Sequence, residues 1–210
     1  MKLIAVCVGL PRQVDWKGKL VTTGIFKQSV AGRVPMGSLN LDGDRQADLT
    51  VHGGVEKAIY AYPREHYDYW RRELPNEALP WGAFGENLTV EGLLETTVNI
   101  GDRFRIGSAE VMVTQPRFPC FKLNLKFGRE DMVKRFLNSR LSGIYFSVVQ
   151  EGEVGAGDAI EQVSRDENNI TVADIVKIYV READDDLTRR ALQVPALAAD
   201  LRSHFQQQIK

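Results

Sequence analysis

The clearest potential for chemistry lies at Cys120, in the stretch QPRFPCFKL that begins at Gln115. Arg117 and Lys122 can supply positive charge on either side of this cysteine, and positive charge favours a thiolate over a thiol. The prolines of the stretch should end the preceding strand and stiffen the loop. A thiolate in a rigid cationic loop can act as a nucleophile, a redox centre or a soft-metal ligand. The alternative is that Cys120 is a small buried apolar residue, the usual state of a free cysteine.

Three other segments carry polar groups in or beside glycine-containing loops, namely residues 27–29, 52–57 and 85–87. If strands bring them to one rim with residues 117–120, the site would combine ammonium, guanidinium, imidazole, amide and thiolate groups. Ammonium and guanidinium groups with exposed glycine amides suit a phosphate or another oxyanion. A thiolate beside such a site suits a ligand that carries both a phosphate and a soft metal.

Each of these residues also has a purely structural interpretation. His52, which precedes two glycines, can simply form hydrogen bonds in a turn, and Lys57 and Arg33 can be solvated strand ends. Asn87 can be a turn residue, because asparagine tolerates the left-handed conformation and bonds its own backbone. A papain-like pair of Cys120 with His52 as base is a further alternative, although no local sequence pattern supports it.

Several other kinds of site are disfavoured by the sequence. The acidic turn at residues 41–48 lacks the twelve-position pattern and closing glutamate of a calcium loop. Zinc is disfavoured because the chain has no paired Cys or His spacing. The sequence contains neither a P-loop nor a G-x-G-x-x-G motif.

Composition limits the class of protein. The chain has 210 residues, with 27 Lys and Arg against 28 Asp and Glu, for a net charge of −1. This balance gives no whole-chain case for binding nucleic acid or a membrane surface. The chain has two cysteines, Cys7 and Cys120, so we expect no disulfide framework. We expect the protein to be in a reducing compartment. The apolar run in residues 1–10 is too short for a signal peptide or a membrane span, so we expect a soluble cytoplasmic protein.

Many short segments of β-branched and aromatic residues predict a mainly β fold of the barrel or sandwich type. Residues 63–74 predict a helix that starts with Pro63 and buries Tyr67, Trp70 and Leu74, with His66 on its exposed side. A second helix is expected at residues 129–137. Strands are expected at residues 3–8, 20–27 (interrupted at Gly24), 58–62, 97–100, 102–106, 110–114, 144–150 and 159–164.

The character of the chain changes near Arg165, after which glycine no longer occurs. Helices are expected at about 172–180, 185–192 and 195–208, and Thr171 to Asp174 matches the start of a helix. The sequence therefore predicts a β-rich domain at residues 1–163 and a small helical domain at residues 164–210.

Four stretches together resemble the MOSC family, named for the C-terminal domain of molybdenum cofactor sulfurase. They are residues 51–58 (VHGGVEKA), 62–67 (YPREHY), 84–89 (FGENLT) and 115–123 (QPRFPCFKL). Their order and spacing are similar to those of the stand-alone bacterial YiiM-like branch, and the likeness covers nearly the whole chain. It implies a closed, mostly antiparallel β-barrel with peripheral helices, followed by a small three-helix domain.

The resemblance also implies a site for the molybdenum cofactor, a pterin with a dithiolene and a phosphate. Cys120 matches the family's invariant cysteine, which ligates the metal in the molybdenum enzymes of this superfamily. The other implied cofactor contacts are Lys27, Ser29, Arg33, His52, Gly53, Gly54, Lys57, Asn87 and Arg117.

The function implied by the resemblance is reduction of an N–OH group to N–H with loss of water, as in the detoxification of hydroxylamino-purines, independent of pyridoxal phosphate. The chain has no flavin, haem or iron–sulfur pattern, so electrons would come from a partner reductase.

The alternative is a sulfur-transfer or cofactor-carrier protein that uses Cys120. In a third hypothesis the terminal helices dock a partner. Their acidic residues offset Arg189, Arg190 and Arg202, which disfavours nucleic acid. Oligomer formation is left open.

Overall fold

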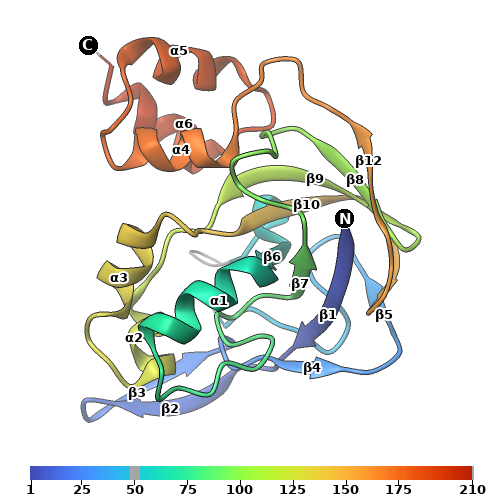
Figure 1. Cartoon of the computed structure of the whole chain (residues 1–210), viewed down its shortest axis with the longest axis vertical. Helices are drawn as coiled ribbons and strands as arrows, with labels where there is room; N and C mark the ends of the chain where they lie inside the picture. The colour runs from blue at the N-terminus through green and yellow to red at the C-terminus, as the bar shows by residue number, and fades with distance from the viewer. Residues whose placement is uncertain (48–52, 210) are drawn as a thin grey trace.

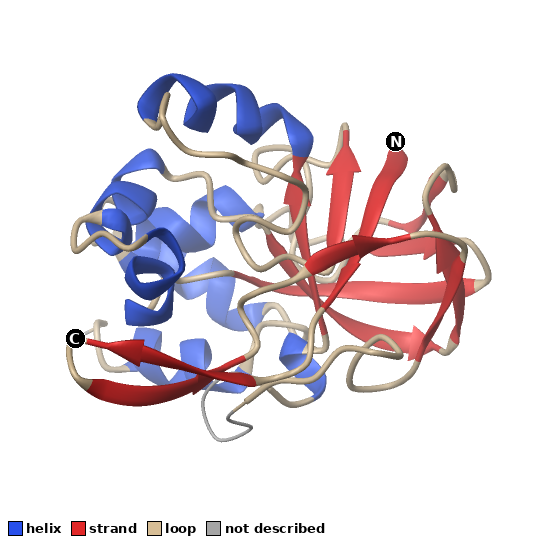
Figure 2. Ribbon diagram, turned by 90° about the horizontal axis from the view of Figure 1, so that it is seen from below, coloured by secondary structure: helices blue, strands red, loops and turns tan. Residues whose placement is uncertain are grey.

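A computed structural model describes residues 1–47 and 53–209 of the protein. Its main element is an eight-stranded sheet, with helices beside it and a helical C-terminal region (Figure 1, Figure 2). Strands β6 and β7 pair in parallel, and the other neighbouring pairs are antiparallel. In sheet order the strands are β12 (Ile160–Ser164), β8 (Arg103–Ile106), β9 (Ala109–Pro116), β10 (Ile144–Gln150), β6 (Ile59–Pro63), β7 (Leu88–Glu91), β1 (Lys2–Val8) and β4 (Gln28–Val30).

The resemblance implied a closed barrel, and the sheet is instead open. In the described part of the chain its strand order has two ends, β12 and β4. Strand β1 meets the start of β12 through an isolated bridge between Lys2 and Ala159, and Gly157 N–H donates to Leu3 O next to it. The reason is a tight turn before β12, in which Asp158 N–H donates to Gly155 O and Gly157 has a φ of 98°. A turn cannot extend the ladder of paired strands.

Two small sheets flank the main one. Strand β5 (Arg33–Met36) pairs with β11 (Gly152–Gly155), and β2 (Arg12–Trp16) pairs with β3 (Lys19–Thr23). The strand expected at residues 20–27 ends at Thr23, where the chain passes close to another backbone. A Cβ atom at Gly24 would lie 2.5 Å from the carbonyl oxygen of Arg45. The chain then runs on through residues 25–27 toward β4.

Three helices lie between the strands. Helix α1 (Arg64–Glu73) follows Pro63, which is its N-cap, and it buries Tyr67 and Trp70 as the sequence predicts. Helix α3 (Met132–Ser139) begins three residues later than expected. Helix α2 (Phe121–Phe127) is not predicted by the sequence, because its seven residues give too short a periodic pattern. It begins directly after Cys120.

The C-terminal region consists of α4 (Val172–Tyr179), α5 (Asp185–Gln193) and α6 (Ala199–Gln206). Thr171 and Asp174 form the reciprocal capping box that starts α4. Helix α6 starts four residues later than expected, because the preceding residues form a turn in which Leu197 N–H donates to Val194 O. None of the described helices is long and apolar enough to cross a membrane.

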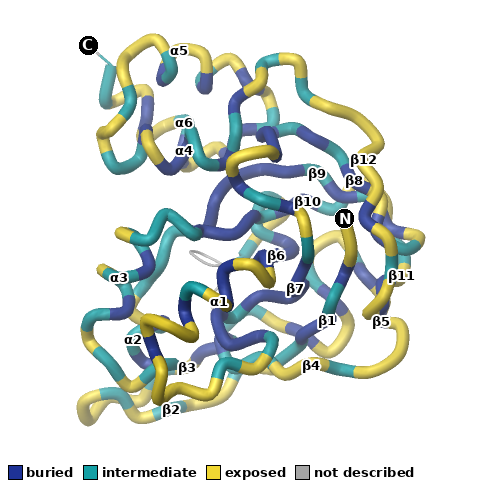
Figure 3. Tube along the Cα trace, in the orientation of Figure 1, coloured by how far each residue is buried: buried dark blue, intermediate teal, exposed yellow. Residues whose placement is uncertain are grey.

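The buried apolar side chains form two clusters. Figure 3 colours the buried stretches of the chain dark blue. The larger cluster contains apolar residues of the main sheet together with side chains of all three C-terminal helices, such as Ile175, Ala191 and Phe205. The smaller is mostly aromatic and lies between α1, α3 and the sheet, with Tyr62, Trp70 and Phe136 among its members. The C-terminal helices therefore share a core with the sheet.

Candidate functional site

A pocket opens beside the start of α2, with an empty volume of about 670 Å³ that includes space open to solvent. The described side chains that line it include five cations and neither Asp nor Glu, so the wall is positively charged. The lining residues are Thr23, Gly24, Ile25, Lys27, Arg45, Gln46, Ala47, Lys57, Tyr60, Gly85, Asn87, Arg117, Phe118, Cys120, Lys122 and Tyr145.

The sheet register places several of these residues together. Tyr145 on β10 is the cross-strand partner of Tyr60 on β6 and, on its other side, of Gln115 on β9. Arg117 follows two residues after Gln115, where β9 has ended. Side chains opposite one another on neighbouring strands share a face. The pocket is therefore built where β9 leaves the sheet and the chain turns into α2.

The structure brings together five of the residues implied by the resemblance: Lys27, Lys57, Asn87, Arg117 and Cys120. The other five are placed as follows.

Ser29 lies on β4 opposite Cys7 and is exposed, and it does not line the described pocket. Arg33 also lies outside it, because its guanidinium pairs with Asp158 at 3.0 Å and donates to the Glu153 carbonyl.

Gly53 and Gly54 precede the short 3-10 helix η1 (Val55–Lys57), whose last residue, Lys57, reaches the pocket. Neither glycine is among the described lining residues. His52 lies outside the described residues.

Cys120 is the half-buried N-cap residue of α2, with φ −122° and ψ 172°. Its backbone carbonyl accepts a hydrogen bond from Leu123 N–H, and its side chain makes no capping bond. The Sγ atom is therefore not used to hold the local fold. It is free to react or to bind a ligand in the pocket.

Arg117 is a buried cation beside Cys120 that lacks a carboxylate partner in the described chain. Its guanidinium carbon lies 5.1 Å from the Tyr60 ring centroid and 5.2 Å from that of Phe136. Its buried Nη1 has no hydrogen-bond partner among the described residues. Burial of an uncompensated charge is costly, typically by several kcal/mol. This arrangement favours an anionic ligand.

Two tyrosines border Arg117 without neutralising it. Burial raises the pKa of Tyr60 well above its usual value, although the positive charge of Arg117 opposes that shift. Burial likewise raises the pKa of Tyr145, again against the effect of Arg117. Both phenols consequently keep their protons at neutral pH. The Tyr60 hydroxyl donates a hydrogen bond to the Ser142 carbonyl oxygen at 2.9 Å.

Lys27 and Asn87 are joined by a buried carboxylate that sequence reasoning did not identify. Asp44 accepts hydrogen bonds from the Lys27 ammonium at 2.5 Å and from Asn87 Nδ2 at 2.8 Å. Asn87 Oδ1 also accepts the backbone N–H of Tyr60 at 3.1 Å. Burial lowers the pKa of Lys27, and the attraction of Asp44 opposes this effect. These groups form a rigid polar wall.

Glu86 fixes the loop on the other side of this wall. Its fully buried carboxylate accepts hydrogen bonds from Gly82 N–H at 2.8 Å, Phe84 N–H at 3.1 Å and Thr89 Oγ1 at 3.0 Å, and also from the Tyr67 hydroxyl. The FGENLT stretch thus acts through Glu86 as a structural anchor, and through Asn87 as part of the pocket.

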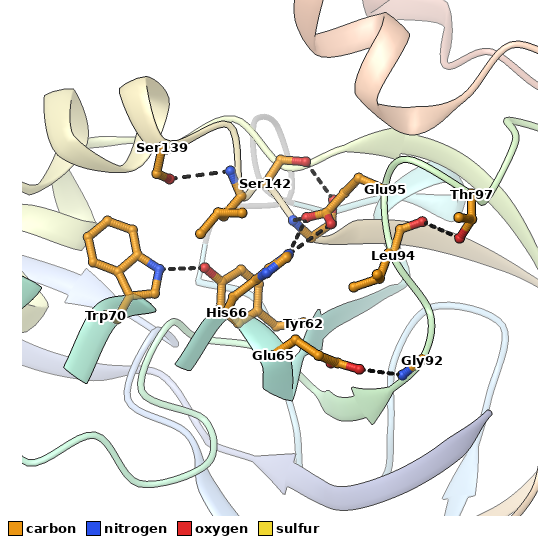
Figure 4. Close-up of polar contacts among 12 residues, drawn as sticks. Tyr62, Glu65, His66, Trp70, Gly92, Leu94, Glu95, Thr97, Ser139 and Ser142 are labelled. Atoms are coloured by element: carbon orange, nitrogen blue, oxygen red, sulfur yellow. Dashed lines mark hydrogen bonds and ion pairs between the residues drawn. The ribbon is translucent and has the colours of Figure 1, made fainter. Parts of the chain in front are cut away.

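A second buried polar network holds the start of β10 (Figure 4). His66, expected to be exposed, is buried, and its Nε2 lies 2.8 Å from a carboxylate oxygen of Glu95. Glu95 also accepts the N–H of Gly143, the residue before β10. This network fixes the strand that carries Tyr145.

Sequence reasoning missed Tyr60, Tyr145, Arg45 and Asp44. The two tyrosines are 85 positions apart, so their proximity depends on strand register. Asp44 lies in the acidic stretch at residues 41–48. The sequence shows that this stretch is charged, but it does not show that Asp44 pairs with Lys27.

Comparisons with known proteins show the family of the chain. Residues 48–161 match the MOSC domain, and residues 170–210 match the YiiM-like 3-alpha helix domain. The chain belongs to the MOSC domain family. A crystal structure of YiiM from Geobacillus stearothermophilus has a TM-score of 0.84, with 35% identity over 100% of this chain and 99% of the other.

Curated relatives extend the comparison. YflK of Bacillus subtilis is 42% identical over 97% of this chain and 92% of its own length. YiiM of Escherichia coli is 41% identical over 84% of this chain and 80% of its own. A Gibberella moniliformis protein named "Reductase" is 32% identical over 85% of this chain, which corresponds to 32% of its own length. The MOSC domain is associated with the molybdenum cofactor in general.

Proposed function

We propose that the pocket binds a molybdenum cofactor and that the protein reduces N-hydroxylated compounds with electrons from a partner reductase. The observation that carries the proposal is the pairing of a free thiol with a buried, unneutralised guanidinium in one cationic pocket. MOSC family membership and the fungal relative named "Reductase" support it.

The side chains of the pocket fit such a cofactor. The Cys120 thiolate is a soft ligand of the kind that the metal would take. Arg117 offers a buried donor without a partner in the described chain, and Lys122 adds positive charge for a phosphate or other anionic group. When bound, the cofactor would supply two-electron chemistry at its metal.

The reaction requires two electrons and two protons. An R–NHOH substrate takes them up, its N–O bond breaks, and R–NH₂ and water are the products. Tyr145 is a proton-bearing group in the pocket wall, because its phenol remains protonated and lines the cavity. Its hydroxyl can donate a hydrogen bond to a substrate in the cavity. Arg117 orients Tyr145, and its guanidinium binds a negatively charged group of the ligand.

The test compares wild type, Cys120→Ala and Cys7→Ala after expression in a host that makes the cofactor. We expect molybdenum and pterin in wild type and in Cys7→Ala, and loss of both in Cys120→Ala with the fold retained. Cys7 is the matched control because its side chain is buried and burial raises its thiol pKa to about 12. Equal metal content in wild type and Cys120→Ala would refute the ligand assignment.

The loaded wild type is then assayed for reduction of a hydroxylamino-purine with an artificial electron donor. Turnover that requires Cys120 supports the reductase. Metal and pterin absent from every variant, together with cyanide-releasable sulfur on Cys120, would instead identify a sulfur carrier.

A further inference from the structure

The C-terminal helices contact the loop that carries Cys120. Phe118, two residues before Cys120, lines the pocket and stacks on Tyr179 at the end of α4. Their ring centroids are 3.7 Å apart and the planes are inclined by 21°. The stack therefore fixes Phe118 from outside the main sheet.

The chain between Phe118 and Cys120 is short and stiff. Its single intervening residue is Pro119, whose ring fixes the φ angle of the backbone. One backbone dihedral angle between Phe118 and Cys120 is therefore fixed, which favours joint movement of the two residues.

The same helices hold a second part of the pocket wall. Asp200 on α6 pairs with the Lys57 ammonium at 2.7 Å, and Glu56 accepts the backbone N–H of Ala199 at 3.0 Å. A backbone hydrogen bond from Val172 N–H to Val98 O, at 3.0 Å, anchors α4 to the body of the protein. The helical unit is therefore tied to the pocket at two places.

We propose that Tyr179 is a positioning residue for Cys120, and that α4–α6 thereby support the pocket wall from outside. This inference rests on the proposed function only in taking the pocket as the working site. It assigns the C-terminal helices a role in ligand binding, beyond docking of another molecule.

The test measures how fast iodoacetamide alkylates Cys120 in the full-length protein, with the site located by peptide mass spectrometry. Tyr179→Leu removes the stack, and we expect the rate to rise about threefold or more as the half-buried thiol becomes more accessible. Tyr179→Phe keeps the ring, so we expect the wild-type rate.

Phe205→Leu is the matched control for general destabilisation. Phe205 is a fully buried aromatic residue of α6, so its replacement weakens the helical unit without removing either ring of the Phe118–Tyr179 stack. We expect a lower thermal midpoint and an unchanged alkylation rate. A wild-type rate in Tyr179→Leu, or an equal rise in Phe205→Leu, would overturn the proposal.

Molybdenum content provides a second measurement on the same variants. We expect it to fall in Tyr179→Leu and to be retained in Tyr179→Phe. Absence of molybdenum from wild type would count against the proposed function alone, because the alkylation rates still decide the role of Tyr179.

Discussion

Two buried cations border the pocket, and their surroundings differ. The Lys27 side chain is 8% exposed and pairs with Asp44, which is 0% exposed. Arg117 lies beside the rings of Tyr60 and Phe136, and its Nη1 is unpaired within the described chain. At the scale of single residues, Lys27 therefore maintains the wall, whereas Arg117 retains the capacity to bind an anion.

We predict that Asp44→Asn destabilises the protein by about 3–5 kcal/mol, because it leaves the Lys27 charge buried without its partner. Adding Lys27→Met should recover much of that loss. Urea unfolding measures both. The exposed pair of Asp68 and Arg71 provides the control, and Asp68→Asn should cost less than about 1 kcal/mol. Equal losses in the two Asp→Asn variants would contradict the prediction.

The buried thiol of Cys7 gives a prediction about pH. Burial, and secondarily the charge of Glu86, raises its pKa from 9.0 to about 12. Between these values the unfolded chain loses the proton and the folded chain keeps it, so stability falls as pH rises. We expect wild type to lose roughly 2–3 kcal/mol more than Cys7→Ala between pH 8 and pH 11. Urea titrations at both pH values test this, and parallel losses would refute it.

At the scale of elements, the loop from Gly82 to Thr89 connects the two halves of the pocket wall. The Glu86 carboxylate accepts hydrogen bonds from backbone N–H groups of the loop. Asn87 links the loop to β6 and to Asp44 by hydrogen bonds. Gly85 allows this geometry, because its φ is 82° and a Cβ atom there would lie 2.9 Å from Ile25 Cγ1. The shape of the loop is thus set by close packing against the opposite wall.

Gly85→Ala should therefore cost more than an alanine at a glycine with a similar φ and open surroundings. Gly32 is that control, because its φ is 83° and a Cβ atom there would have no heavy atom within 4 Å. Both substitutions carry the left-handed penalty of about 1–2 kcal/mol. We expect Gly85→Ala to lose at least about 1 kcal/mol more by urea unfolding. Equal costs would show that the packing at Ile25 relaxes freely.

Local patterns predicted what is encoded locally. The apolar periodicity of α1 and the capping box of α4 were correct, and the loop of Cys120 lies at the pocket as expected. Three features depend on distant partners and were not predictable: the cross-strand neighbours Tyr60 and Tyr145, the bond of Asp44 to Lys27, and the turn at Gly157 that leaves the sheet open. Register and burial are properties of the assembled sheet.

At the scale of the whole molecule, the sheet and the terminal helices are parts of one packed body. The larger core cluster includes Leu3 and Val111 of the sheet as well as Ile175 and Phe205 of the helices. Backbone bonds between residues 98–100 and 170–172 connect the two parts directly. Loss of the helices would expose the apolar side chains with which the sheet packs against them.

We predict a single cooperative unfolding transition. The tryptophans, at positions 16, 70 and 81, all precede the terminal helices, so their fluorescence reports the β-rich part. Far-UV circular dichroism also reports α4–α6. Because the core is shared, urea curves from the two probes should coincide. A helical signal that is lost at lower urea concentration would show that the two parts unfold separately.

The unneutralised charge of Arg117 also has a consequence for the protein's lifetime in a cell. An anion that pairs with this guanidinium binds the folded chain and not the unfolded one. It therefore raises the free energy of unfolding by RT ln(1 + [L]/Kd). Proteases act on the unfolded fraction, so chains that lack the anion are degraded sooner. The steady-state amount of protein should therefore follow the supply of its ligand, without any change in transcription.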